Sequence, residues 1–128
     1  MSSSVLDASA LLTVLLAERG AQRTLDAARR GAALGTVNFA ETVARMRETG
    51  AIEDEIREQI AKFGLEIVPF DEELAYQTGL LRPLTRHLGL SLGDRACLAL
   101  GLRLGLLVLT ADAAWAGLQL GVQIEVVR

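Results

Sequence analysis

Residues 91–112 read SLGDRACLALGLRLGLLVLTAD, and this stretch contains one complete helix-to-strand unit. Its first part, Ser91–Leu104, is mostly apolar and predicts a helix that begins at a typical capping serine. Its second part, Leu106–Leu109, is a short apolar run typical of a buried strand, and Asp112 follows it closely. A helix that leads into a buried strand is the repeating unit of α/β proteins with parallel sheets.

The same alternation of helices and strands extends through the rest of the chain. Further strands are expected at Ser3–Leu6, Leu34–Val37, Leu65–Val68 and Ile124–Val127. Further helices are expected at Ala8–Glu18, Ala21–Arg30, Asn38 to about Thr49, Glu53–Phe63, Asp71 to about Leu81, and a short segment near Ala113–Gly117. This order favours an α/β fold whose parallel sheet is covered on both faces. No linker, repeat or low-complexity tract appears, so residues 1–128 are expected to form a single domain.

One face of the segment Glu53–Phe63 is strongly apolar. Ile52, Ile56, Ile60 and Phe63 recur at helical spacing and therefore lie on the same side of the predicted helix. Hydrophobic residues also make up 51% of the whole chain. Together these observations suggest that this face is a surface reserved for a protein partner.

Composition excludes several classes of protein. The chain has 128 residues, and its charged fraction of 23% is typical of globular domains. One cysteine cannot form an internal disulfide, and one cysteine with one histidine cannot build a zinc site. The net charge of −3 counts against a protein that simply coats nucleic acid. No apolar stretch is long enough for a membrane span and Met1–Val5 lacks a basic signal sequence, so a cytoplasmic location without membrane attachment is expected.

Four of the sixteen acidic residues lie apart from the charged helical faces. Asp7 ends the first predicted strand, and Asp112 follows the strand at Leu106–Leu109. Glu41 and Asp94 each fall in the first turn of a predicted helix. Because active sites in parallel sheets lie at the carboxyl ends of the strands, we expect all four acids near one edge of the sheet.

Each of these acids also has a purely structural explanation. Glu41 and Asp94 each stand three residues after a helix-capping residue, where an acid returns a hydrogen bond and complements the helix dipole. Asp7 and Asp112 fit turn residues or helix caps. Taken singly, Glu41 and Asp94 suit the capping role better than a ligand role. The joint placement of all four acids favours a functional cluster.

A cluster of carboxylates has a chemical requirement. Two such charges repel by roughly 3 kcal/mol at a separation near 5.5 Å and an effective dielectric near 20. A fold tolerates several of them in one cleft only with a divalent cation or with partial protonation. Mg²⁺ and Mn²⁺ prefer oxygen ligands and keep waters that can attack a phosphodiester. The acids therefore indicate a metal-dependent hydrolase as one candidate function.

Four stretches of the chain resemble PIN-domain ribonucleases of the VapC toxin type: Val5–Leu11, Asn38–Glu41, Leu90–Leu100 and Leu109–Asp112. The resemblance implies a three-layer α/β/α fold with a five-stranded parallel sheet. It also implies endoribonuclease activity with Mg²⁺ or Mn²⁺, neutralisation by a cognate antitoxin, and a homodimer. The residues that match the family's acidic quartet are Asp7, Glu41, Asp94 and Asp112, with Ser9 and Thr110 at the positions of supporting hydroxyl groups.

The resulting hypothesis is the toxin of a toxin–antitoxin pair, which hydrolyses RNA with a metal-activated water. Asp7, Asp94 and Asp112 would bind the metal directly or through waters, and Glu41 would complete the cluster. One alternative is a non-catalytic PIN-like module whose acidic cleft binds a basic partner. Another is a phosphatase of the haloacid-dehalogenase type, which is weaker because Asp7 lacks the Asp-x-Asp pairing of that class.

Overall fold

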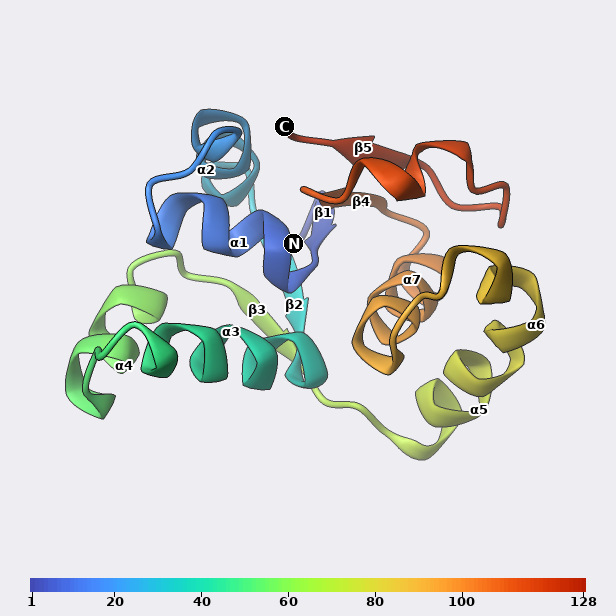
Figure 1. Ribbon diagram of the computed structural model, residues 1–128, viewed down its shortest axis with the longest axis horizontal. Helices are drawn as coiled ribbons and strands as arrows, with labels where there is room; N and C mark the ends of the chain where they lie inside the picture. The colour runs from blue at the N-terminus through green and yellow to red at the C-terminus, as the bar shows by residue number, and fades with distance from the viewer.

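The computed structural model describes residues 1–128 as a five-stranded sheet with helices on both sides (Figure 1). The strands are β1 (Ser4–Leu6), β2 (Ala32–Gly35), β3 (Glu66–Val68), β4 (Leu107–Thr110) and β5 (Ile124–Val126). The α-helices are α1 (Ala8–Leu15), α2 (Ala21–Arg29), α3 (Thr36–Glu48), α4 (Glu53–Ala61), α5 (Glu72–Leu80), α6 (Arg82–Thr85) and α7 (Leu92–Leu104). Two short 3₁₀ helices are η1 (Arg86–Leu88) and η2 (Ala113–Gly117). All strand pairs are parallel, which confirms the predicted α/β class and the three-layer arrangement.

The order in which the chain adds strands to the sheet reverses beside the first strand, β1. The sheet runs β3-β2-β1-β4-β5, so the chain moves outward from β1 to one edge and then returns to fill the other side. β1 pairs with β4 in the register Leu6 to Leu109. Ligands in open parallel sheets bind where the strand order reverses, outside the carboxyl ends of the strands. The carboxyl ends of β1 and β4 are therefore the expected location of a site.

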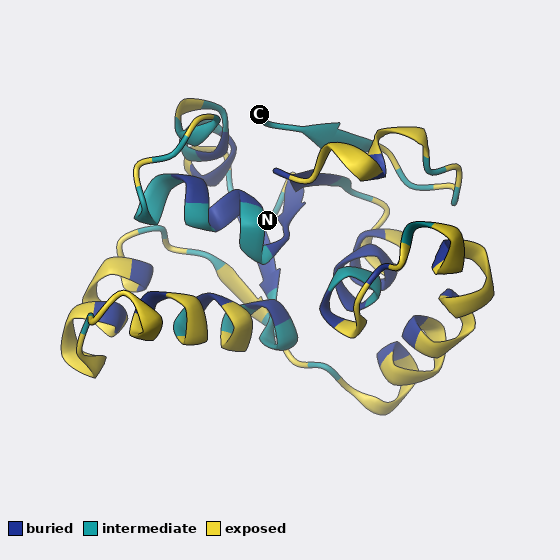
Figure 2. Cartoon of the chain, viewed as in Figure 1, coloured by how far each residue is buried: buried dark blue, intermediate teal, exposed yellow.

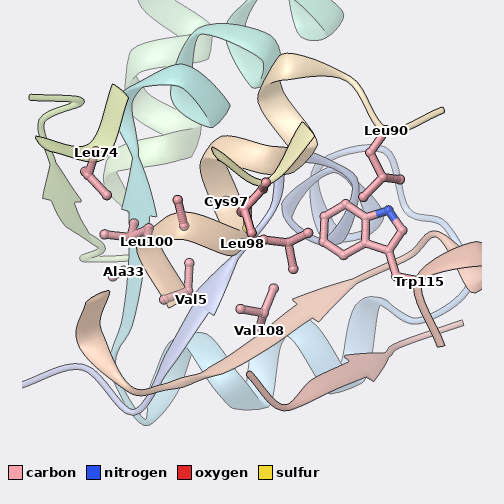
Figure 3. Close-up of a cluster of buried hydrophobic side chains, with 11 residues drawn as sticks. Val5, Ala33, Leu74, Leu90, Cys97, Leu98, Leu100, Val108 and Trp115 are labelled. Atoms are coloured by element: carbon pink, nitrogen blue, oxygen red, sulfur yellow. The ribbon is translucent and has the colours of Figure 1, made fainter. Parts of the chain in front are cut away.

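Successive residues of the central strands point to opposite faces of the sheet, and both faces are buried. One core contains Val5, Ala33 and Val108 together with Leu98 and Trp115, as Figure 3 shows. The other contains Leu6, Leu34 and Leu109 together with Ala10, Leu11 and Ala27. The continuous apolar character of the strands in the sequence follows from this burial on both sides.

The helices form the two outer layers. α7 packs on β1, β2 and β4 and is itself covered by α5, whereas α1 and α2 pack on the opposite face. α3 contacts both α1 and α7, so it joins the two layers beside the sheet (Figure 1). Figure 2 shows that the buried residues follow the sheet and the inner sides of these helices. None of the helices combines the length and apolar character that a membrane span requires.

The second strand and the third helix begin earlier than the sequence indicates. β2 covers Ala32–Gly35 rather than Leu34–Val37, and α3 begins at Thr36 rather than Asn38. Alanine is a weak strand former, so local propensity conceals the start of β2, which its partners β1 and β3 determine. The shift places Asn38 inside α3, where it is not the helix cap, and moves Glu41 beyond the first turn.

The apolar face of α4 serves mainly the interior of the chain. Ile56 and Ile60 are only 3% and 5% exposed and form a small core with Met46 of α3. Ile52, at 57%, is the one exposed member of the predicted face. The expectation that this face as a whole is reserved for a partner is wrong, because the α3–α4 contact already buries its centre.

Candidate active site

Asp7 lies at the carboxyl end of β1 and caps the N-terminus of α1. Only 4% of the residue is exposed. Its Oδ1 accepts hydrogen bonds from the backbone N–H of Ala10 at 2.8 Å and from the Ser9 hydroxyl at 2.7 Å. Burial raises the pKa of Asp7 from its usual 3.8 to about 6 despite these hydrogen bonds, and the nearby Asp94 charge adds to the rise. The ionised form of Asp7 therefore gains stability from any cation placed beside it.

Two hydroxyl groups join the carboxyl ends of β1 and β4. The Thr110 hydroxyl donates to Oδ2 of Asp7 at 2.9 Å and lies 3.2 Å from the Ser9 hydroxyl. The Ser9 oxygen accepts from the backbone N–H of Ala111 at 2.9 Å, and the Thr110 oxygen accepts from that of Asp112 at 3.1 Å. Through this network, Ser9 and Thr110 hold the Asp7 carboxylate in one orientation.

Asp94 lies in the first turn of α7. Ser91 is the cap of this helix, and its hydroxyl accepts from the backbone N–H of Asp94 at 3.1 Å. Oδ2 of Asp94 in turn accepts from the backbone N–H of Ser91 at 2.9 Å. The capping role predicted from the sequence is therefore present. It occupies one carboxylate oxygen and keeps the side chain at the positive end of the helix.

Glu41 reaches the site from α3 and lies against Gly93, the residue before Asp94. Its Oε1 accepts from Nδ2 of Asn38 at 2.8 Å, and the same amide donates to the carbonyl oxygen of Gly93 at 3.0 Å. Partial burial raises the pKa of Glu41, the Asn38 hydrogen bond opposes this rise, and the charge of Asp94 reinforces it. The interpretation of Glu41 as a helix cap is wrong, because α3 begins five residues earlier at Thr36.

Three of the four predicted acids influence one another electrostatically. The charge of Asp94 raises the pKa of both Asp7 and Glu41. Cys97, buried one turn further along α7, has its pKa raised by burial first and then by all three of these carboxylates. Asp7, Glu41 and Asp94 thus create one region of negative potential at the junction of β1, α3 and α7.

Asp112 has a different orientation. Its backbone joins the network through Thr110, but the residue is exposed and its carboxylate accepts from the backbone N–H of Ala114 at 3.0 Å as the cap of η2. The structure therefore brings Asp112 to the predicted edge of the sheet, where its carboxylate caps η2. Its proposed role as a ligand rests on its position after β4.

The donor groups at this edge suit a hard divalent cation. The acidic groups are carboxylates that hydroxyl groups support, and the nearby thiol of Cys97 is buried; oxygen ligands of this kind are those that Mg²⁺ and Mn²⁺ prefer. The buried Asp7 carboxylate, which hydrogen bonds hold in one orientation, also fits such an ion. No three acidic, histidine or cysteine side chains are spaced as a complete metal shell.

Sequence reasoning missed two residues of this region. Asn38 is 2% exposed and connects Glu41 to the N-terminal turn of α7, although its position suggested a helix cap. Gly93 leaves space beside its Cα that the Glu41 carboxylate occupies. Asn38 lies in one of the four stretches noted in the sequence, and Gly93 precedes Asp94 in another. That the two residues contact each other follows only from the packing of α3 against α7.

Comparisons with known proteins agree with this architecture. The family model described as "PIN domain" matches residues 4–119. Among solved structures, the chain resembles a toxin–antitoxin complex from Klebsiella pneumoniae (20% identity, TM-score 0.75) and the DNA-bound VapBC complex from Salmonella typhimurium (18%, 0.72). It also resembles VapBC-5 from Mycobacterium tuberculosis (25% identity, TM-score 0.58). Each alignment covers 98% of this chain and 98% of the other. A comparison with curated proteins found no match.

Proposed function

The chain belongs to the PIN domain family, and from this membership we propose that it is a metal-dependent endoribonuclease, the toxin of a toxin–antitoxin pair. The observation that carries the proposal is that Asp7 lies at the carboxyl end of β1, where the strand order reverses, with Asp94 near enough for its charge to raise the pKa of both Asp7 and Glu41. The resemblance to structures of toxin–antitoxin complexes supports the toxin assignment. A cytoplasmic location, where RNA substrates are abundant, remains part of this proposal.

The proposed chemistry assigns a role to each polar residue. Asp7, Asp94 and Asp112 hold Mg²⁺ or Mn²⁺ directly or through waters, and Ser9 and Thr110 keep Asp7 oriented. When bound, the cation lowers the pKa of a water and offsets negative charge in the transition state. Glu41 completes the cluster and orients the attacking water. Hydrolysis would break the bond between phosphorus and the 3′ oxygen: the water would supply a hydroxyl group to phosphorus and a proton to the departing 3′ oxygen, which leaves a 5′-phosphate and a 3′-hydroxyl.

A cleavage assay with defined RNA tests this proposal. The full chain is incubated with a mixture of transfer, ribosomal and messenger RNA in the presence of Mn²⁺ or of EDTA, and product ends are identified. Asp7→Asn and Asp94→Asn each remove ligand charge with little change of shape, so we expect cleavage to fall at least about 100-fold in both. Native circular dichroism in both variants shows that loss of the fold is not the cause.

Other outcomes distinguish the alternatives. Full activity in EDTA, or undiminished activity in both variants, contradicts the proposed site. Hydrolysis of small phosphomonoesters without cleavage of RNA favours the phosphatase alternative. The absence of any hydrolysis, together with binding of a basic peptide at the acidic edge, favours the non-catalytic module.

The antitoxin partner has a suitable surface on the side away from α5. A groove of about 780 Å³ lies between α1, α2 and α4, with Val14, Leu25 and Phe63 among its apolar lining residues. Arg29 and Lys62 also line it and are exposed. We propose that an apolar segment with acidic residues binds here, because apolar side chains fill the groove while its carboxylates meet the two cations.

Charge reversal tests this binding surface. Arg29→Glu with Lys62→Glu should weaken binding of the protein encoded by an adjacent short reading frame at least about tenfold, as calorimetry or biolayer interferometry would measure. RNA cleavage by the free variant should remain normal, because the groove lies apart from the acidic edge. Arg19→Glu, an exposed charge outside the groove, is the control. Equal affinity of the double variant and the native chain would rule out this groove.

The homodimer predicted from the sequence also needs a surface, and α5 with α6 provides one. Tyr76, Leu80 and Leu84 are 64%, 67% and 58% exposed and form an apolar ridge. Glu72 lies near one end of this ridge and Arg86 near the other, both exposed. Antiparallel packing of two ridges about a twofold axis would place Glu72 of each copy near Arg86 of the other. We propose this ridge as the dimer surface.

A further inference from the structure

The amide of Asn38 makes an unusual pair of contacts between two helices. Nδ2 donates to Oε1 of Glu41 at 2.8 Å, one turn further along α3, and to the carbonyl oxygen of Gly93 in α7 at 3.0 Å. Asn38 is 2% exposed, and its bond to Gly93 is buried, whereas its bond to the exposed Glu41 is partly buried. One side chain thus holds a proposed catalytic carboxylate and also the helix turn that carries Asp94.

The orientation of this amide is set by chemistry. Both partners of Nδ2 are acceptors, so a flipped amide would place Oδ1 against a carboxylate and a carbonyl oxygen. In the observed orientation, Oδ1 is buried with no hydrogen-bond partner. A buried unpaired acceptor is unfavourable and calls for an explanation. Here the Oδ1 atom of the amide stays unpaired, while its Nδ2 atom holds Glu41.

Gly93 contributes space to the same arrangement. A Cβ at this position would lie 2.5 Å from both Oε1 and Cδ of Glu41, closer than real Cβ contacts. Gly93 does not have a positive φ, and it lies in the first turn of α7, so the backbone itself would accept alanine. A side chain at Gly93 would therefore displace the Glu41 carboxylate from its position, whereas the conformation of the helix would accept one.

We propose that Asn38 and Gly93 are positioning residues. Asn38 orients the Glu41 carboxylate by hydrogen bonding. Because Gly93 has no side chain, this carboxylate can lie against the N-terminal turn of α7, beside Asp94. This proposal rests on the proposed function, because it concerns the same acidic edge. It deepens that function by explaining how Glu41, an exposed residue on a separate helix, keeps a fixed place relative to Asp94.

Gly93→Ala separates positioning from stability. Alanine favours helix more than glycine does, so a merely structural glycine would give a variant that melts no lower than the native chain and binds Mn²⁺ normally. Displacement of Glu41 instead predicts a Mn²⁺ dissociation constant at least about tenfold higher by calorimetry, with a similar loss in RNA cleavage rate. Gly79→Ala, at an open helical position with no neighbouring atoms within 4 Å, is the matched control and should leave both unchanged.

Asn38→Asp provides a second variant. The side chain keeps its shape but loses the donor N–H groups and places a carboxylate against Glu41, so the same loss of Mn²⁺ affinity and cleavage is expected. Each substitution is also made in a Glu41→Ala background, where no carboxylate remains to be positioned. There, Gly93→Ala and Asn38→Asp should each change Mn²⁺ affinity less than about twofold, as expected of residues that act through Glu41.

The outcomes are distinguishable. If the native chain binds Mn²⁺ and cleaves RNA while Gly93→Ala does both equally well, the positioning proposal is wrong and the proposed function stands. An equal loss from Gly93→Ala in the native and the Glu41→Ala backgrounds also overturns it, because the effect then bypasses Glu41. If the native chain neither binds Mn²⁺ nor cleaves RNA, the proposed function and this inference fail together.

Discussion

Asp7 is a carboxyl group that the fold keeps almost free of water. Ser9, Ala10 and Thr110 donate to its oxygens, yet burial dominates and its pKa rises from 3.8 to about 6. The native state therefore holds this proton more tightly than the unfolded chain does. The contribution of Asp7 to stability is complete below pH 3.8 and is lost as the pH rises through about 6. This difference corresponds to on the order of 3 kcal/mol.

Asp7→Asn should therefore stabilise the metal-free protein in a pH-dependent manner. Asparagine keeps an oxygen for Ala10 and Ser9 but carries no charge to desolvate. In EDTA at pH 8 we expect the variant to melt higher by roughly 10 °C, and at pH 4 the two proteins should melt nearly alike. Thermal melting followed by circular dichroism from pH 4 to pH 8 measures this difference.

Asp71→Asn is the control with the opposite sign. The backbone N–H of Leu74 and the side chain of Arg103 lower the pKa of Asp71, so its contribution is present above its usual pKa and is lost in acid. This variant should lose stability near neutral pH relative to acid. If Asp7→Asn changes the melting temperature by the same amount at every pH, the charge of Asp7 is not the cause of that change.

Among the helices and strands, the features that depend on local sequence patterns were predicted correctly. The cap at Ser91 with Asp94, the helix that begins near Asp71 and the buried strand β4 are all present. β2 was misplaced because its alanines carry little strand signal, and the error made Asn38 a cap instead of a link between helices. The relation of Asn38 to Gly93 depends on two helices that are distant in the sequence, so no local pattern reveals it.

The exposed ridge on α5 and α6 gives a prediction at this scale. Leu80→Glu places a charge at the centre of the proposed dimer surface and should convert a dimer into a monomer at tens of micromolar, as light scattering would measure. Because Leu80 is 67% exposed, the melting temperature of the subunit should change little. Leu104→Glu, an exposed leucine outside the ridge, should remain dimeric. A native chain that is monomeric at this concentration would refute the proposed surface.

For the whole molecule, strand order accounts for the position of the site. β1 and β4 are neighbours in the sheet although about a hundred residues separate them in the sequence. Asp7 and Thr110 therefore meet at the point where the strand order reverses. Sequence reasoning predicted this edge from the rule for parallel sheets. A helix cap is also one of the structural roles that the sequence predicts for Asp112, and the structure confirms it, because the Asp112 carboxylate caps η2.

The most direct test of the central claim, that this edge binds a divalent cation, is thermal melting of the native chain and Asp7→Asn at pH 8, with EDTA or with excess Mn²⁺. A ligand that binds only the native state adds about 2.7 kcal/mol at 100 times its dissociation constant, or roughly 10 °C for a domain of this size. We predict this increase for the native chain and a much smaller one for Asp7→Asn, which should nevertheless melt higher in EDTA. Identical melting of the native chain with and without Mn²⁺ would contradict the account.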